Sequence, residues 1–256
     1  MTAKIVVAAH IAYPVPQDDI YYPIHAGKSG RESIEFPGDD TGENISHKND
    51  FYSELTCLYW AWKNLRADYL GLVHYRRHFR YRKKGSKWDS VLSHGELEKV
   101  LQETEVVLPR KRRYYIETVG SHYGHTFDEL HLSVARAAIE DMYPQYTHSF
   151  DKIMDRRSAH MFNMFIMKRE YADAYCQWLF SVLEELETRI DVSGMTPFEA
   201  RYLGRVSERL LDVWIDKNKI RYKEIGYIQM EPVNWAKKGS AFLLARFGGK
   251  KYKNSF

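Results

Sequence analysis

Two arginines and two histidines follow directly after one short apolar segment of this 256-residue chain. Residues 69–73 (YLGLV) have the composition of a buried strand, and the cluster His74-Tyr75-Arg76-Arg77-His78 comes next. In open α/β sheets, ligands bind at the carboxyl ends of the strands. Because guanidinium groups stay charged and bind oxygen atoms in pairs, arginines at that edge suit a phosphate or a diphosphate. The alternative is a strand that leads into solvent through a basic loop.

Polar residues also follow the first apolar segment of the chain. Residues 4–9 (KIVVAA) predict an N-terminal strand, and His10 stands at its end. The segment from 37 to 46 is dense in turn-forming residues. Its short hydrogen-bonding side chains suit a base or a ribose, and they are Asp40, Asn44 and Ser46. Ser46 or Asn49 is equally suited to be the N-cap of the next helix.

The rest of the chain alternates apolar strands with amphipathic helices. Helical periodicity predicts helices over residues 49–65, 96–102, 133–142, 151–157, 169–189 and 198–217. Apolar segments predict strands over residues 105–109, 161–167 and 220–228, and residues 21–30 predict a loop. Asn163 interrupts the middle one of these strands, and a buried amide needs partners, so it either ties strands together or reaches a ligand. The order predicts an α/β domain with a central mixed sheet and a helical C-terminal part.

Composition and charge favour an ordinary globular domain over a nucleic-acid-binding module. Hydrophobic residues make up 44% of the chain, and 34 acidic residues nearly balance 38 basic ones. The basic residues gather locally, at 76–87 and 110–113. Nucleic-acid binders usually carry a stronger net charge or a recognised motif. We therefore expect no nucleic-acid partner, although a basic binding module is the alternative from another functional class.

Cysteine usage and hydropathy predict a cytoplasmic protein. Cys57 and Cys176 both fall in apolar helical patterns, which indicates buried free thiols in a reducing compartment. The apolar stretch at the N-terminus is too short for a signal peptide, and no segment approaches the length that spans a bilayer.

Three histidines, His122, His125 and His131, raise the question of a metal site. Their spacing, H-x2-H-x5-H, matches no familiar zinc pattern, and no cysteine lies nearby. Hydrogen bonding to a polar ligand, or solvated loop histidines, is favoured over a structural metal.

The C-terminal residues 236–256 differ in composition from the domain at residues 1–235. They contain six lysines and arginines around a central apolar group and no acidic residue. This is the composition of a segment that lies on an anionic membrane, which predicts peripheral contact with the inner face of the cytoplasmic membrane. A solubilising tail, or a helix packed on its own domain, remains as an alternative.

Several longer stretches resemble the DUF4422 family. They are GENISHKNDFYSELTCLYWAWKNL, YLGLVHYRRHF, MFNMFIMKREYADAYCQWLF and RYLGRVSERLLDVW, and the resemblance extends from about His10 to Trp214. It implies a GT-A-like glycosyltransferase domain with a Rossmann-like sheet, of the kind found among bacterial capsule, exopolysaccharide and O-antigen genes. It also implies a UDP-sugar donor, with a hexose of galactose type, and a glycan or lipid-linked acceptor.

The resemblance leaves one departure to explain. GT-A enzymes usually hold a divalent ion at an Asp-x-Asp motif, whereas His74-Tyr75-Arg76 stands in the corresponding place here. Arg76 and Arg77 can supply positive charge to the leaving diphosphate instead. We therefore expect a metal-independent enzyme without a cofactor. A catalytically inactive sugar-nucleotide-binding protein is the remaining alternative.

Position in the chain then predicts a role for each candidate residue. The nucleoside and its phosphates are expected to contact His10, Asp40, Asn44, Ser46 and Asn49. The diphosphate and the donor sugar are expected to contact Lys63, His74, Tyr75, Arg76 and Arg77. The acceptor is expected near His122, Asn163 and Glu208. If the enzyme inverts, Glu208 or His122 takes the acceptor proton.

Overall fold

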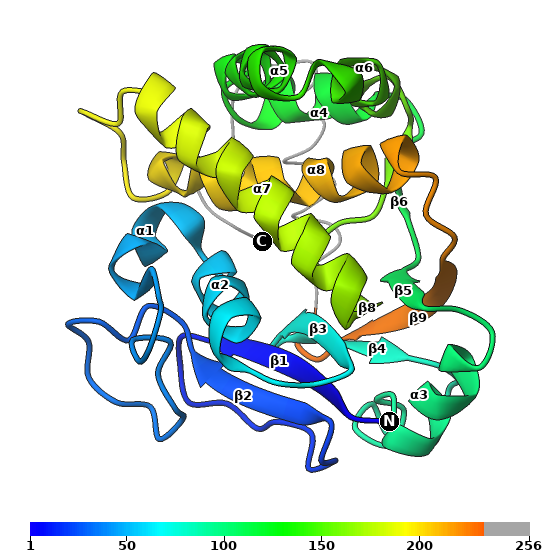
Figure 1. The fold of residues 1–256 in the computed structure, drawn as a ribbon. Helices are drawn as coiled ribbons and strands as arrows, with labels where there is room; N and C mark the ends of the chain where they lie inside the picture. The colour runs from blue at the N-terminus through cyan, green and yellow to red at the C-terminus, as the bar shows by residue number, and fades with distance from the viewer. Residues whose placement is uncertain (233–256) are drawn as a thin grey trace.

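The strand expected at residues 69–73 forms the centre of the sheet as β3 (Tyr69–His74). In the computed structural model, which describes residues 1–232, β3 pairs in parallel with β1 (Ala3–Ala9). On its other side, β1 pairs in parallel with β2 (Tyr21–His25). Because the three strands are parallel, their carboxyl ends meet at one end of the sheet (Figure 1). His10 follows β1 there, and His74 is the last residue of β3.

Two strands share the other side of β3. The first part of β3 pairs antiparallel with β8 (Phe165–Lys168), and His74 at its end pairs with Arg77, which begins β4 (Arg77–Arg80). The sheet continues from β4 to β9 (Lys223–Gln229), from β9 to β5 (Val106–Pro109), and from β5 back to β8. Strands β3, β4, β9, β5 and β8 therefore pair in a ring. A separate short ladder joins β6 (Arg112–Arg113) and β7 (Ser158–Ala159).

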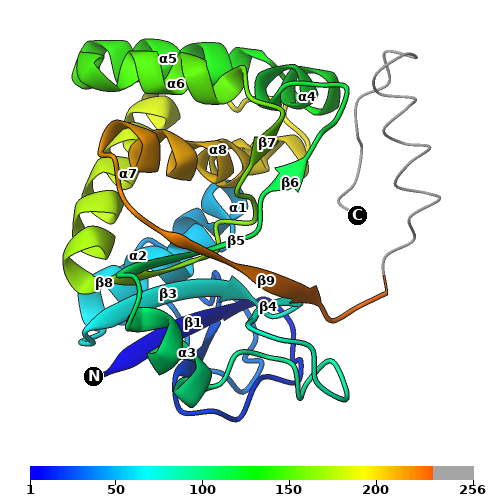
Figure 2. The same cartoon turned by 90° about the vertical axis from the view of Figure 1, so that its right-hand side faces the viewer.

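Helices cover both faces of this sheet. They are α1 (Asn49–Tyr52), α2 (Leu55–Asn64), α3 (His94–Leu101), α4 (Val119–Thr126), α5 (Leu130–Met142), α6 (Thr147–Met154), α7 (Arg169–Arg189) and α8 (Tyr202–Lys217). Helices α2 and α7 pack directly on one face of the sheet, and α8 packs on α7. Helices α4, α5 and α6 form an outer layer beyond α8, whereas α3 covers the opposite face (Figure 2).

Side-chain alternation along β1 explains the two-sided core. Val6 and Ala8 face the cluster that includes α2, α7 and α8, whereas Ile5 and Val7 face the cluster that includes α3. A strand covered on both faces is apolar at successive positions, and KIVVAA has this composition. Gly71, in the middle of β3, lies where an added Cβ would come 3.0 Å from the carbonyl oxygen of Phe165. The close approach of β8 therefore requires glycine there.

The structure corrects three expectations about the elements. Residues 21–30 are not a loop throughout, because they include β2, whose Pro23 is tolerated in a strand at the sheet edge. The helix expected over 49–65 is divided at Ser53, which has a positive φ of 54°. The strand expected over 161–167 begins only at Phe165, because the residues before it form a turn.

Membrane contact was expected from the segment 236–256, which lies outside the described residues. Within residues 1–232, no helix combines the length and the apolar character needed to cross a bilayer.

Candidate functional site

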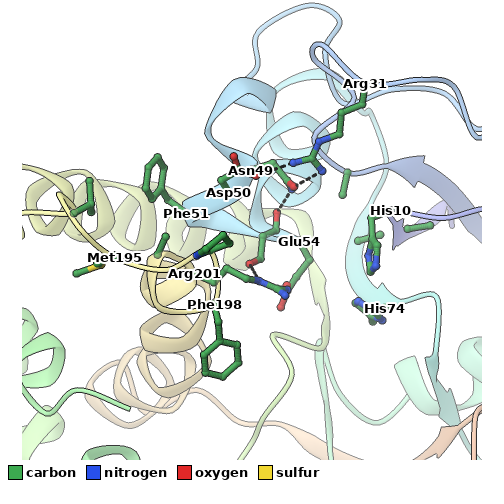
Figure 3. A pocket seen from close by; sticks show the side chains of 17 residues that line it. His10, Arg31, Asn49, Asp50, Phe51, Glu54, His74, Met195, Phe198 and Arg201 are labelled. Atoms are coloured by element: carbon green, nitrogen blue, oxygen red, sulfur yellow. Dashed lines mark hydrogen bonds and ion pairs between the residues drawn. The ribbon is translucent and has the colours of Figure 1, made fainter. Parts of the chain in front are cut away.

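A cavity of about 1020 Å³ opens at the carboxyl ends of β1 and β3. Figure 3 shows His10 and His74 on one side of it, and Phe51 and Met195 on the opposite side. Its polar wall also includes Arg31, whose guanidinium donates to Asn49 Oδ1 at 3.0 Å and to Asp50 Oδ1 at 2.7 Å. We call this the strand-end cavity. It has one polar wall and one apolar wall, which suits a ligand of mixed character.

A second cavity of about 200 Å³ lies beside the first. The two share Ser53, Glu54, His74, Phe198 and Arg201 in their walls. Arginines dominate the second cavity, which we call the arginine cavity, and they are Arg76, Arg77, Arg112, Arg201, Arg205 and Arg209. Its lining includes two carboxylates, Glu54 and Glu208. The excess of guanidinium groups over carboxylates gives this cavity a positive charge, which suits an anion.

The arginines after β3 are held in different ways. Arg76 forms an ion pair with Glu231 at 3.2 Å and lies over the ring of Tyr75. Arg77 lies over the ring of Phe162, 4.2 Å from its centroid, and its buried Nε has no hydrogen-bond partner. Burial lowers the pKa of Arg77, although a guanidinium remains charged at neutral pH. A bound anion would accept hydrogen bonds from this buried guanidinium and so complete its pairing.

The other wall of the arginine cavity comes from α8 and the turn before it. Arg201, Arg205 and Arg209 recur every fourth residue, so the helical repeat places them on one face. Arg205 stacks on the rings of Phe127 and Phe198, at 4.3 Å and 4.0 Å from the two centroids. Burial lowers the pKa of Arg205 to about 10, which still leaves it charged at neutral pH. Stacking on two rings fixes the long side chain of Arg205 in place.

Arg209 and Arg201 are tied to neighbouring polar groups. Arg209 Nη1 donates to Glu208 Oε2 at 2.7 Å, and its side chain is buried. Arg201 Nε donates to Ser53 Oγ at 3.0 Å. This last contact joins the beginning of α8 to the break between α1 and α2, where the two cavities meet.

Glu54 stands directly after that break and lines both cavities. Its Oε1 accepts a hydrogen bond of 2.9 Å from Asn163 Nδ2. Asn163 also donates to the carbonyl oxygen of Gly204 at 3.1 Å and accepts from Ser207 Oγ at 2.9 Å. Burial raises the pKa of Glu54, and the hydrogen bond from Asn163 opposes this change while the charge of Glu208 adds to it.

Two histidines of the site are uncharged at neutral pH. Burial, followed by the charges of Arg77 and Arg76, lowers the pKa of His74 well below its usual value. His122 is bonded through Nδ1 to Glu117 Oε2 at 2.8 Å, and burial lowers its pKa to about 4 in spite of this carboxylate. Both imidazoles are therefore neutral ligands or hydrogen-bonding groups rather than cations.

The structure brings seven of the predicted residues to the two cavities. They are His10, Asn49, His74, Arg76, Arg77, His122 and Glu208. The predicted residues that line neither cavity are Asp40, Asn44, Ser46, Lys63, Tyr75 and Asn163.

The residues away from the cavities have contacts within the protein. Ser46 Oγ donates to Asp39, which accepts from the backbone N–H of Gly27 at 2.8 Å, so this pair fixes a loop. Lys63 pairs with Glu43 at 2.8 Å. Tyr75 is buried, with its ring 5.2 Å from that of His10.

Three of these residues remain, and they are Asp40, Asn44 and Asn163. Asn44 bonds the backbone of Gly42 and Ser46, and Asp40 is exposed. Asn163, expected near the acceptor, lines neither cavity and bonds Glu54, Gly204 and Ser207.

Several lining residues were not predicted from the sequence. The R-x3-R-x3-R repeat from Arg201 to Arg209 is a readable signal, since four-residue spacing places like charges together on a helix. Glu54 has no such signal, because it stands inside a segment with continuous helical periodicity. Only the break at Ser53 turns it toward the cavities.

A metal-capable group exists elsewhere in the described part of the chain. Asp18, Asp19 and His94 have ligand atoms within 4.8 Å of one another. Asp18 accepts from the backbone N–H of His94 at 2.9 Å and from that of Ile20 at 3.3 Å. These residues line neither cavity, and their hydrogen bonds fix the start of α3.

Comparison with known proteins identifies the family. Residues 4–219 match the domain of unknown function DUF4422. The chain belongs to this family. No curated protein sequence matches the chain. The DUF4422 family predicted from the sequence motifs is thus confirmed.

Among solved structures, the DUF4422 chain is similar to the apo structure of the bifunctional glycosyltransferase WbbM. The two are 29% identical with a TM-score of 0.85, and the match covers 91% of this chain and 46% of that one. The chain therefore spans about half the length of the bifunctional protein. The chain shares its mixed α/β fold with the matched part of WbbM.

Proposed function

We propose that the chain is a glycosyltransferase. It would move a hexose of galactose type from a UDP-sugar to a glycan or lipid-linked oligosaccharide, in the synthesis of a bacterial capsule, exopolysaccharide or O-antigen. The observation that carries the proposal is the arginine cavity at the carboxyl end of β3. Similarity to part of a bifunctional glycosyltransferase supports the same reaction class.

The strand-end cavity suits the nucleoside part of the donor. Its volume of about 1020 Å³ reaches the upper end of the range usual for ligand pockets, and its walls offer both polar and apolar groups. Asn49 and Arg31 are hydrogen-bonding groups on the polar side. The diphosphate would then lie at the junction of the two cavities, close to His74 and Arg77.

The arginines have a definite task in this reaction. When the bond between the anomeric carbon and the diphosphate oxygen breaks, negative charge develops on the leaving UDP. Two opposite charges about 4 Å apart attract each other by roughly 4 kcal/mol at an effective dielectric constant near 20. Arg76 and Arg77 would stabilise the leaving group in this way, and Arg201 and Arg205 line the same cavity from the turn before α8 and from α8 itself.

The residues of the site do not fit a catalytic divalent cation. Such a cation prefers several carboxylate and water oxygens. The carboxylates that line the arginine cavity are already held, Glu208 by Arg209 and Glu54 by Asn163, and the surrounding guanidinium groups repel a cation. We therefore propose that the enzyme works without a divalent metal.

Nucleotide binding provides the first test. Purified protein is heated with UDP, GDP, CMP or dTDP, each with and without EDTA. We expect UDP to raise Tm equally in both conditions, since a ligand at 100 times its Kd stabilises by about 2.7 kcal/mol. A rise that EDTA abolishes would contradict metal independence, and no rise with any nucleotide would contradict the donor class.

Substitution of the arginines tests the location. Arg77→Ala should remove most of the shift by UDP, because it removes a charge from the proposed diphosphate position. Arg113→Ala is the matched control, since Arg113 is exposed on β6 and lines neither cavity. Release of UDP from UDP-galactose in the presence of an alkyl galactoside distinguishes an enzyme from a protein that only binds sugar nucleotides.

A further inference from the structure

We propose that Glu54 is the group that removes the proton from the acceptor hydroxyl, and that Asn163 positions its carboxylate. The inference rests on the proposed glycosyltransferase function and deepens it. Glu54 lines both cavities, so it stands where a donor in one and an acceptor in the other would meet. Glu208 and His122, the groups expected from the sequence, line only the arginine cavity.

The hydrogen bonds of the three candidates separate them further. Glu208 accepts a charge-assisted hydrogen bond from Arg209 at 2.7 Å, so a cation already occupies one of its oxygens. His122 is bonded to the buried carboxylate of Glu117. Glu54 has one oxygen fixed by a neutral amide, the 2.9 Å bond from Asn163 to Oε1. A neutral donor orients a carboxylate without lowering its basicity as much as a cation does.

The backbone around Asn163 shows how firmly this amide is placed. Asn163 has a positive φ of 53°, in the left-handed region that asparagine tolerates better than most residues. Its side chain bonds the carbonyl oxygen of Gly204 and the hydroxyl of Ser207, both in α8. The amide is therefore locked by α8 with one N–H directed at Glu54. Locked supporting groups of this kind are what precise acid–base chemistry requires.

The local electrostatics support the same residue. A general base works best when its pKa approaches the working pH. Burial raises the pKa of Glu54, whereas burial lowers that of His122 to about 4 and leaves it a weak base. Glu54 is therefore the stronger proton acceptor of this pair.

The step balances as a single displacement. The acceptor oxygen forms a bond to the anomeric carbon of the donor while its proton passes to the Glu54 carboxylate. The bond from that carbon to the diphosphate oxygen breaks, and its electron pair leaves with UDP beside the arginines. Attack from the face opposite the leaving group inverts the anomeric configuration. The proton on Glu54 returns to solvent when the products leave.

Glu54→Gln is the decisive variant, because a glutamine oxygen can still accept from Asn163. We expect the rate of UDP release from UDP-galactose, with octyl β-galactoside as acceptor, to fall 10²- to 10⁴-fold. Tm and its shift by UDP should stay near the wild-type values. Glu98→Gln is the matched control, since Glu98 is an exposed residue of α3 outside both cavities.

Each outcome decides a separate point. If the wild type releases UDP and Glu54→Gln keeps its rate, the role of Glu54 is overturned and the glycosyltransferase function stands. A product that retains the anomeric configuration of the donor, as seen by NMR of the first turnover, would likewise overturn the role of Glu54 and leave the glycosyltransferase function standing. If the wild type transfers no sugar from any UDP-hexose, the proposed function fails and this inference fails with it.

Asn163→Gly separates positioning from mere stability. Glycine adopts a φ of 53° without strain, so the backbone can persist while the amide is lost. The hydrogen bond from Asn163 lowers the pKa of Glu54, so its loss should move the acid limb of the kcat/KM profile to higher pH. A lower Tm with an unmoved pH profile would overturn the positioning role.

Discussion

The side chains around the arginine cavity illustrate how a fold stabilises clustered positive charge. Arg205 is enclosed by Phe127 and Phe198, and Arg77 lies over Phe162. Each ring presents its negative face to a cation, which offsets part of the repulsion between neighbouring guanidinium groups. Planarity matters in this arrangement, because a guanidinium stacks on a ring and still offers donors at its edge.

We predict that Arg205→Lys weakens substrate binding although it conserves the charge. Lysine cannot stack as a plane between two rings or present a bidentate edge. The KM for UDP-galactose should rise about tenfold, which corresponds to about 1.4 kcal/mol. Steady-state kinetics with Arg113→Lys as control tests this, and an unchanged KM would show that charge is sufficient at this position.

Some helices and strands follow from their local sequence, whereas others depend on their partners in the fold. Strands β1 and β3 and helix α7 have patterns that agree with the observed structure, since burial on the sheet or against it selects apolar residues in a regular order. β2 has a proline and two tyrosines, and only its pairing with β1 makes it a strand.

The candidate site was harder to predict than the fold. His74, Arg76 and Arg77 were found because strand ends position polar residues by a local rule. Glu54 and Asn163 are 109 positions apart, and they meet because α8 packs against α1, just before Glu54, and accepts a hydrogen bond from Asn163 at Gly204. Nothing within either segment encodes that contact.

Gly71 gives a prediction at the same scale. An added methyl group would lie 3.0 Å from the backbone oxygen of Phe165 and 3.2 Å from Ile5 Cγ1, inside the sheet. Gly71→Ala should therefore lower the free energy of unfolding by about 1–3 kcal/mol. Gly95→Ala, in α3 with no atom within 4 Å of the new Cβ, should be neutral or slightly stabilising. Urea unfolding of the two variants tests the contrast, and equal stabilities would refute it.

Buried neutral histidines tie the stability of the whole molecule to pH. Burial lowers the pKa of His78 and of His122 to about 4, and burial together with the nearby arginines lowers that of His74. The unfolded chain protonates its histidines near pH 6.5, so below that pH it binds more protons than the native state. Their contribution to stability is therefore complete above about pH 6.5 and decreases toward pH 4.

We expect Tm to fall steeply between pH 6.5 and pH 5. For a histidine whose pKa drops from 6.5 to about 4 on folding, linkage gives a loss of about 2 kcal/mol at pH 5. Thermal unfolding across this range measures the effect. His78→Gln, which removes one titrating group from a buried position with a hydrogen bond to Tyr75, should flatten the dependence.

The ring of strands has a consequence for how copies of the protein meet in concentrated solution. An open sheet presents two unpaired edges, and each can recruit a strand from another molecule. Here β8 returns to β3, so the sheet within residues 1–232 has its open edge at β2. Even there, the backbone around Gly38 bridges to His25 and covers the end of the strand. Intermolecular strand addition, the first step toward aggregation, therefore has one short entry point instead of two.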